Sequence, residues 1–138
     1  MVALTALYGD SEKKYTSDRE NDGICNVTVR GVRGAAYCTL VRLLNQGGTE
    51  LHDITVEDVY DDSENCPYLD GSVAHAVRLG DKSRYGGGED RPAENICIRN
   101  VYGTHSVVVA IDGAYRNVRC ENVRGNRADQ ILVRRSGD

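Results

Sequence analysis

The sequence predicts an all-β fold, a right-handed, single-stranded parallel β-helix (a solenoid) of about four to five coils. Three observations support this prediction: a nine-residue pattern recurs, its aliphatic positions lie two apart, and a second short strand follows each copy. The last two copies are 22 residues apart, a period typical of one solenoid coil. The four copies begin at Asn26, Asp53, Asn95 and Asn117.

Each position of the nine-residue pattern has a physical reason. Aliphatic residues alternate with polar ones, which is the period of a strand with one buried face. The sixth position holds residue types that tolerate a left-handed backbone, so we expect a bend at Gly31, Asp58, Asn100 and Asn122. The Val that follows returns to the inside. Because parallel strands stack about 4.8 Å apart, the Asn and Asp residues should form a side-chain ladder along the axis.

The second strand of each coil alternates between inside and outside in the same way. Corresponding strands are expected at residues 41–43, 77–79, 109–111 and 131–133. Residues 2–7 form a further strand with nothing before it in the chain. We therefore expect this end of the solenoid to be bare or covered by another molecule.

Two long insertions interrupt the repeat, at residues 61–72 and 80–92. They flank the strand expected at residues 73–79. Insertions in repeat proteins map to loops on one side, which is often the working side. These insertions are therefore the first place to look for a site.

Length and composition indicate one domain spanning residues 1–138. Trp and Phe are absent, so the core must consist of Val, Ile, Leu and Cys. The net charge of −4 argues against a nucleic-acid partner, and no apolar run is long enough to cross a membrane. The first residues do not resemble a signal peptide, and the compartment stays open.

The five cysteines have no metal-like spacing, and we expect neither disulfides nor a zinc site. Cys120 occupies an aliphatic position and is expected in the core. Cys25 lies two residues before Val27 and is expected on the same, inward face. Cys97 is expected to face outward.

The order of these elements resembles the polygalacturonase-type (pectin-lyase-like) glycoside hydrolases, right-handed β-helix enzymes that cut acidic polysaccharides. Residues 26–29 resemble the rung before the family's Gly-His-Gly, residues 76–79 resemble the strand carrying its Arg-Ile-Lys, and residues 94–112 are the closest match. Residues 2–5 resemble the strand that follows the family's paired aspartates. The resemblance therefore implies the later part of a longer β-helix.

The chain departs from the family at its functional motifs. The catalytic carboxylates would lie upstream of Met1, and the Gly-His-Gly position falls near Tyr37 and Cys38, without a His. Arg78 matches the Arg of Arg-Ile-Lys, but Gly80 replaces its Lys. Inverting hydrolysis needs two facing carboxyl groups. We therefore expect a carbohydrate-associated segment that binds acidic polysaccharide and does not hydrolyse glycosides alone.

Arg78 is the centre of the expected substrate contacts, because an outward Arg can hold a sugar carboxylate bidentately. A surface Arg in a ladder with Arg42 is the simpler interpretation. The insertion that follows adds charged side chains and a flat Tyr, which suit hydrogen bonding and stacking on sugars. The complete set of expected contacts is Arg42, Arg78, Asp81, Lys82, Arg84 and Tyr85.

The acidic residues of the first insertion are a weak candidate for Ca²⁺, because clustered carboxylates are the ligands that calcium prefers. They are Asp61, Asp62, Glu64 and Asp70. This leaves open a calcium-dependent polysaccharide lyase with Arg78 or Arg42 as its base. The spacing is not a calcium-loop signature, so a solvated loop is the simpler interpretation.

A non-catalytic solenoid for adhesion or assembly is the remaining alternative. Solenoids need covered ends, and no amphipathic capping helix is visible in the sequence. We therefore expect self-association, or capping by another chain. His75 lies three residues before Arg78 and is expected to face inward as a structural residue.

Overall fold

The structure is a computed structural model that describes residues 1–7, 23–35, 38–46, 50–65, 75–81 and 92–136. In these ranges the chain forms strands, one short 3₁₀ turn (η3, Ser63–Asn65) and no α-helix. The strands are β1 (Val2–Leu7), β2 (Ile24–Gly34), β3 (Thr39–Gln46), β4 (Leu51–Asp61), β5 (His75–Leu79), β6 (Ala93–Gly103), β7 (Val107–Asp112), β8 (Tyr115–Gly125) and β9 (Ile131–Ser136).

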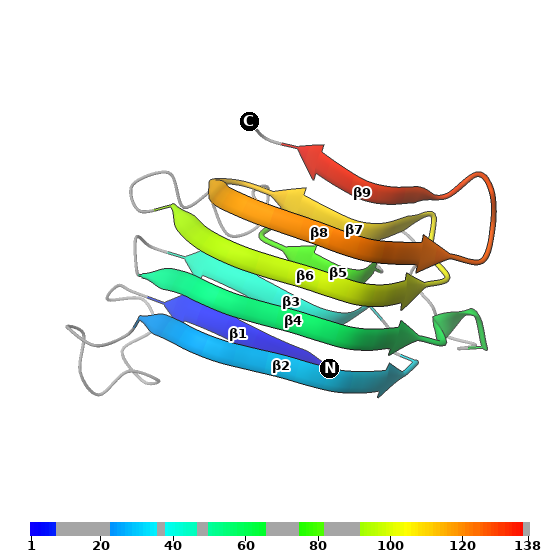
Figure 1. The fold of residues 1–138 in the computed structure, drawn as a ribbon, viewed down its shortest axis with the longest axis horizontal. Helices are drawn as coiled ribbons and strands as arrows, with labels where there is room; N and C mark the ends of the chain where they lie inside the picture. Colours follow the sequence, from blue (N-terminus) through cyan, green and yellow to red (C-terminus); the bar gives the residue numbers. More distant parts are fainter. Residues whose placement is uncertain (8–22, 36–37, 47–49, 66–74, 82–91, 137–138) are drawn as a thin grey trace.

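The strands form two parallel sheets, and the chain alternates between them (Figure 1). Sheet A has the order β1-β3-β5-β7-β9, and sheet B has the order β2-β4-β6-β8. Each strand therefore pairs with the strand two places further along the chain. In Figure 1 the strands of sheet B run in the opposite direction to those of sheet A. The prediction of an all-β fold with parallel pairing is confirmed.

The register confirms the alignment of the repeats. Ile96 pairs with Ile54 on one side and with Val118 on the other. In sheet A, Val77 likewise lies between Val41 and Val109. The alignment expected for the last strand is off by two residues. Ile131, the first residue of β9, pairs with Val107, the first residue of β7. Val133, and not Ile131, aligns with Val109.

The predicted bends are confirmed by left-handed backbone angles, with φ of 73° at Gly31, 56° at Asp58, 54° at Asn100 and 50° at Asn122. The ladder is also present. The Asn100 amide donates to Asp58 Oδ1 at 3.1 Å, and the Asn122 amide donates to Asn100 Oδ1 at 2.9 Å. Each amide thus ties one strand of sheet B to the next on the surface.

A second column of left-handed residues, at the first position of the pattern, was not predicted. It consists of Asn26, Asp53, Asn95 and Asn117. The Asn117 amide donates to Asn95 Oδ1 at 2.7 Å. The bend at Asn26 interrupts the alternation of the strand, so Cys25 is exposed and the expectation that it faces inward is wrong.

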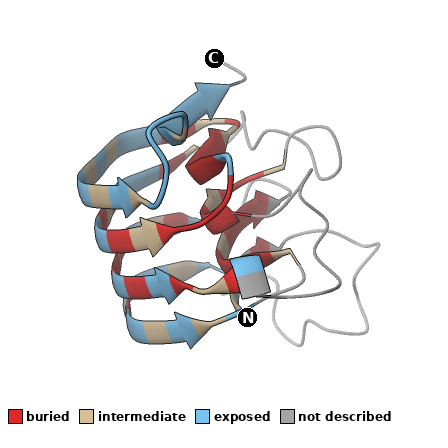
Figure 2. Cartoon of the chain, turned by 90° about the vertical axis from the view of Figure 1, so that its right-hand side faces the viewer, coloured by how far each residue is buried: buried red, intermediate tan, exposed pale blue. Residues whose placement is uncertain are grey.

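The core lies between the two sheets and consists of aliphatic columns (Figure 2). Cys120 packs against it, as predicted. Among the described residues the only aromatic ring in the core cluster is Tyr115, whose hydroxyl donates to the Leu43 carbonyl at 3.1 Å and accepts from the backbone N–H of Asn45 at 3.2 Å. Burial raises the pKa of Tyr115 to about 12. The hydroxyl is therefore a neutral crosslink between β8 and β3.

The two insertions do not leave from one side of the fold. The first follows the C-terminal end of β4, in sheet B, and the second follows the C-terminal end of β5, in sheet A. Because the two sheets run in opposite directions, these ends lie at opposite edges (Figure 1). The expectation of a shared working side is therefore wrong.

In the described part of the chain no helix has the length and apolar character needed to cross a membrane.

Candidate functional site

The outer face of sheet B carries a shallow groove of about 400 Å³, which we call the polar groove. It lies beside the second column of left-handed residues, of which Asp53, Asn95 and Asn117 line it. Thr55, Cys97 and Arg119 form its other side, since they are neighbours in register across β4, β6 and β8. Its lining residues are Asp53, Ile54, Thr55, Asn95, Ile96, Cys97, Asn117 and Arg119.

A second depression, the acidic hollow, continues the groove and shares Asp53 and Asn95 with it. His52 Nδ1 lies 2.7 Å from Asp53 Oδ2, and His52 Nε2 lies 3.8 Å from Glu50 Oε2. The hydrogen bond with His52 lowers the pKa of Asp53, so this carboxylate is ionised at neutral pH. The hollow is lined by Glu50, Leu51, His52, Asp53, Pro92, Glu94 and Asn95.

Strand β8 gives the other end of the groove a positive charge. Its outward side chains include Arg116, Arg119 and Arg124 but only one acid, Glu121. All four are exposed. Among the described residues no carboxylate lies within ion-pair distance of Arg119. The face thus changes from acidic to basic along the groove, although the whole chain has a net charge of −4.

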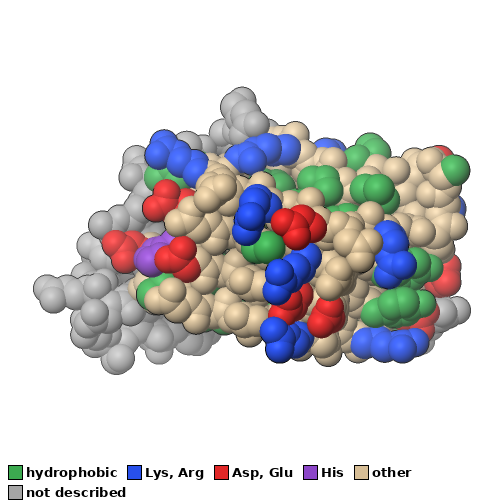
Figure 3. Space-filling view, in the orientation of Figure 1, with side chains coloured by type: hydrophobic (Ala, Val, Ile, Leu, Met, Phe, Trp, Pro, Cys, Tyr) green, Lys and Arg blue, Asp and Glu red, His purple; other side chains and the backbone are tan. Residues whose placement is uncertain are grey.

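A column of alternating charge runs through the middle of the same face, where Arg side chains lie next to acidic side chains (Figure 3). In register it reads Arg30, Glu57, Arg99, Glu121. Arg99 Nε donates to Glu57 Oε2 at 2.6 Å, and Arg30 donates to Glu57 Oε1. These two bonds lower the pKa of Glu57, that from Arg99 most. The column is a structural ladder along the axis, as opposite charges on neighbouring strands stabilise a sheet.

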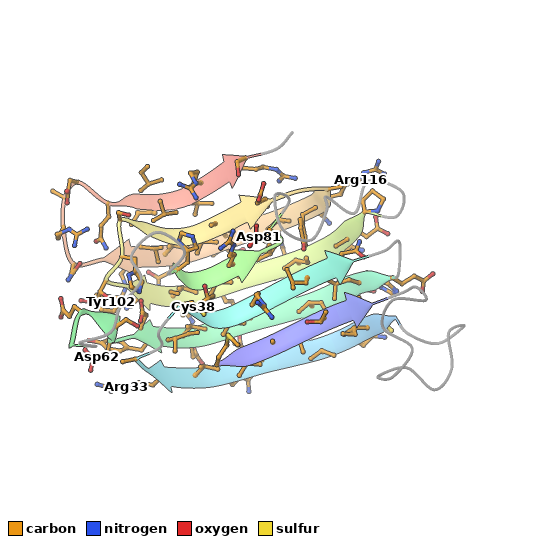
Figure 4. The ribbon with its side chains drawn as sticks, turned by 180° about the vertical axis from the view of Figure 1, so that it is seen from behind. Arg33, Cys38, Asp62, Asp81, Tyr102 and Arg116 are labelled. Atoms are coloured by element: carbon orange, nitrogen blue, oxygen red, sulfur yellow. The ribbon has the colours of Figure 1, made fainter. Side chains whose placement is uncertain are left out.

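An aromatic column lies near the opposite edge of the face from Arg116. The rings of Tyr60 and Tyr102 stack at 4.6 Å, and the Arg33 guanidinium lies 4.5 Å from the Tyr60 centroid. Figure 4 shows Arg33 and Tyr102 at one edge of the molecule and Arg116 at the other. Because these ring faces cover one another, they are not free to stack on a sugar. This column also works as a ladder.

The predicted contacts of sheet A are only partly described. Arg78 projects outward beside Arg42, as expected. Its side chain is only 16% exposed, because Nη2 lies 3.2 Å from Asp81 Oδ2 and Nε donates to the Gly80 carbonyl at 3.0 Å. Lys82, Arg84 and Tyr85 lie outside the described residues. The guanidinium of Arg78 is therefore bound by Asp81 and by the Gly80 carbonyl of the same chain.

The acidic residues of the first insertion do not converge on one point. Asp61 is fully buried, where it accepts hydrogen bonds from Ser63 and lies 3.1 Å from His105 Nε2. Burial opposes ionisation, but the bonds from His105 and Ser63 outweigh it and lower the pKa of Asp61. The exposed Glu64 instead accepts a bond from Asn126 at 2.8 Å.

The other two members of this set are Asp62 and Asp70. Asp62 lies at the edge near Arg33 (Figure 4), and Asp70 is outside the described residues. Within the described ranges no three His, Cys, Asp or Glu side chains are placed to hold a metal ion. Binding of Ca²⁺ by this set stays an untested prediction.

His75 faces inward, as predicted, and its Nδ1 lies 2.9 Å from the Val107 carbonyl oxygen. Sequence reasoning assigned Asn95 and Asn117 to the ladder and did not recognise the groove beside them. The sequence did contain a signal for the basic end of the groove. The last copy of the repeat and the residue before it have Arg at three outward positions (Arg116, Arg119 and Arg124), and no other copy does.

Comparisons with known proteins add no family to this description. A scan against protein-family models, a search of curated proteins and a search of solved structures each found no match to the chain.

Proposed function

We propose that this chain is a right-handed parallel β-helix that binds acidic polysaccharide without cleaving it. The alternation of strands between two parallel sheets supports the β-helix, because each strand returns to its own sheet one coil later. Such parallel crossovers are right-handed in nearly all proteins. Four strands in one sheet and five in the other correspond to about four to five coils.

The polar groove with Arg119 at its basic end is the observation that carries the binding proposal. Acidic polysaccharides carry a carboxylate on each uronate and hydroxyl groups between them. A guanidinium can donate two parallel hydrogen bonds to such a carboxylate. Arg119 is exposed and has no described ion-pair partner, so it is available for this bond.

The rest of the groove suits sugar hydroxyls. Asn95 and Asn117 each use part of their amide in the ladder, and an amide has two donor hydrogens and two acceptor lone pairs. Thr55 adds a hydroxyl that can donate or accept. These groups repeat about every 4.8 Å from strand to strand, which places them along an extended polymer.

The acidic hollow gives the proposed site a direction. Glu50, Asp53 and Glu94 would repel a polyuronate, whereas Arg116 and Arg119 would attract it. The polymer would therefore be held most strongly over β8 and β6, with Thr55 of β4 at the far end of the site, and would avoid the hollow.

Titration calorimetry with polygalacturonate tests this proposal, with a neutral dextran as the control polymer. We expect binding of the acidic polymer only. Arg119→Ala should weaken it about tenfold, because a charge-assisted hydrogen bond contributes roughly 1.5–3 kcal/mol. Arg134→Ala, which removes an exposed Arg on the outer face of sheet A, should have no effect. Equal losses in both variants, or no binding, would contradict the site.

The same mixtures distinguish binding from catalysis. New reducing ends would indicate a glycoside hydrolase. Ultraviolet absorbance of an unsaturated product that appears only with Ca²⁺ would indicate a lyase. We expect neither signal, and either one would contradict the non-catalytic proposal.

A further inference from the structure

The two outermost strands of sheet B, β2 and β8, have complementary side chains. Both pair with only one described neighbour, so each has a backbone edge that no described strand covers. Such an edge is a template for another parallel strand. The question is which strand the side chains of these two edges would accept.

The charged column answers this in part, because its two ends have opposite signs. It begins at Arg30 on β2 and ends at Glu121 on β8. The Arg30 side chain is 66% exposed although it bonds to Glu57, and Glu121 is exposed above Arg99. If a second copy followed in the same register, its Arg30 would lie beside Glu121 and continue the alternation.

The apolar columns beneath are complementary in the same register. Val27 and Val32 of β2 and Val118, Cys120 and Val123 of β8 pack against the core but stay partly exposed. Their counterparts on β4 and β6 are fully buried, because they have a neighbour on both sides. A copy stacked on β8 would bury three columns at once. In each column a Val of β2 would lie against Val118, Cys120 or Val123 of β8.

One column opposes stacking. Arg124 ends the aromatic column that begins with Arg33, so stacking would bring two guanidinium groups together. Arg116 and Arg119 would meet the neutral residues Cys25 and Thr28 and contribute little. One opposite-charge pair and three apolar columns therefore outweigh one like-charge contact.

We propose that copies of this chain stack head to tail, with β8 of one copy pairing in parallel with β2 of the next and Glu121 facing the next copy's Arg30. The contact is heterologous, since it joins two different surfaces. It therefore does not close as a symmetric dimer, and because each copy would continue the sheet in the same direction it extends as an open filament. The polar groove lies on the outer face and would continue across the junction.

Sedimentation velocity of the 138-residue chain over a range of concentrations tests the stacking. We expect oligomers that grow with concentration. Arg30→Glu and Glu121→Arg each place like charges at the junction and should weaken association about tenfold, because like charges directly opposite on neighbouring strands destabilise a sheet. Arg116→Glu is the control. It makes the same charge change as Arg30→Glu, lies on the same edge strand as Glu121, and should leave association unchanged.

Mixing the two charge-reversed variants gives the decisive result. The arginine introduced by Glu121→Arg can pair with the glutamate introduced by Arg30→Glu, and the opposite ends of both variants keep their natural pair. The mixture should therefore associate like the unsubstituted chain, which also shows that both variants fold. Arg124→Glu should strengthen association by removing the repulsion from Arg33.

A monomer at all concentrations would overturn the proposal, as would oligomers that neither charge reversal weakens or a mixture that does not recover. Because sedimentation requires no sugar, its outcome is independent of polysaccharide binding.

Discussion

The inner and outer strands of sheet B have the same sequence pattern and different surroundings. On β4 and β6 the inward residues Ile54 and Ile96 are each 1% exposed. On β2 and β8 the equivalent residues Val27 and Val118 are only partly buried. The difference arises because an inner strand has a neighbour above and below, and an outer strand has a described neighbour on one side only.

This comparison shows that a residue's contribution depends on where its strand lies in the sheet as much as on its place in the repeated pattern. The place in the pattern decides whether a side chain points inward. The place of the strand, inner or outer, decides how much surface that side chain removes from water. Identical substitutions on inner and outer strands should therefore have different effects.

The largest difference is expected for the Val that follows the second bend. Val101→Ala on β6 should reduce the free energy of unfolding by about 2–3 kcal/mol, because it opens a cavity in a fully buried column. Val123→Ala on β8 should reduce it by about 1 kcal/mol or less, since that side chain is partly exposed. Urea unfolding measures both, and equal effects would contradict the comparison.

A smaller difference is expected in the ladder. Asn100 donates to Asp58 and accepts from Asn122, whereas in this ladder Asn122 forms one described bond, to Asn100. Asn100→Ala should cost about 2 kcal/mol, from lost hydrogen bonds and a left-handed Ala, and Asn122→Ala about 1 kcal/mol. Asn100→Gly, which tolerates the backbone, should recover part of the loss. Thermal unfolding measures these variants. If Asn100→Gly is no more stable than Asn100→Ala, backbone strain does not contribute to the loss of stability.

The smallest effect is a pH dependence from His75 on β5, an inner strand of sheet A. Burial, most of all, holds the pKa of His75 below its usual 6.5, with the charges of Arg78 and Arg134 acting in the same direction and the hydrogen bond to Val107 opposing. The unfolded chain therefore takes up a proton before the folded chain does. This stabilisation is complete above about pH 6.5 and declines as the pH falls below it.

The loss from this group can reach at most about 1.4 kcal/mol per pH unit. Urea midpoints of the unsubstituted chain and of His75→Asn at about pH 7.5 and about pH 5.5 measure it, since these values lie on either side of the ordinary pKa of His. The difference between the two pH values should be smaller in the variant. An unchanged difference would show that His75 does not contribute.

Most of the fold was predictable because its information is local. Alternation at two residues defined the strands, and the repeated Asn-aliphatic pattern defined the register that pairs Ile96 with Ile54 and Val118. The bends at Asp58 and Asn100 were predictable because few residue types tolerate a left-handed backbone. Cys25 was placed on the wrong face because Asn26 looked like an ordinary strand residue.

The candidate site was much less predictable, because it depends on side-chain contacts that the strand pattern does not specify. Arg78 was expected to reach outward to a ligand, and its position is as expected, but its guanidinium bonds to Asp81 and Gly80. Asp61 was expected in a solvated loop and lies buried against His105. Neither partner could be identified by spacing in the sequence.

The sequence by itself determined the parallel, all-β pairing of this chain, since a repeated alternating pattern can bury its apolar residues only by stacking on its own copies. The tertiary structure alone decided which outward side chains neutralise one another and which stay available. Glu57 lies between two arginines and Arg119 does not face an acid, because register across three strands sets those distances.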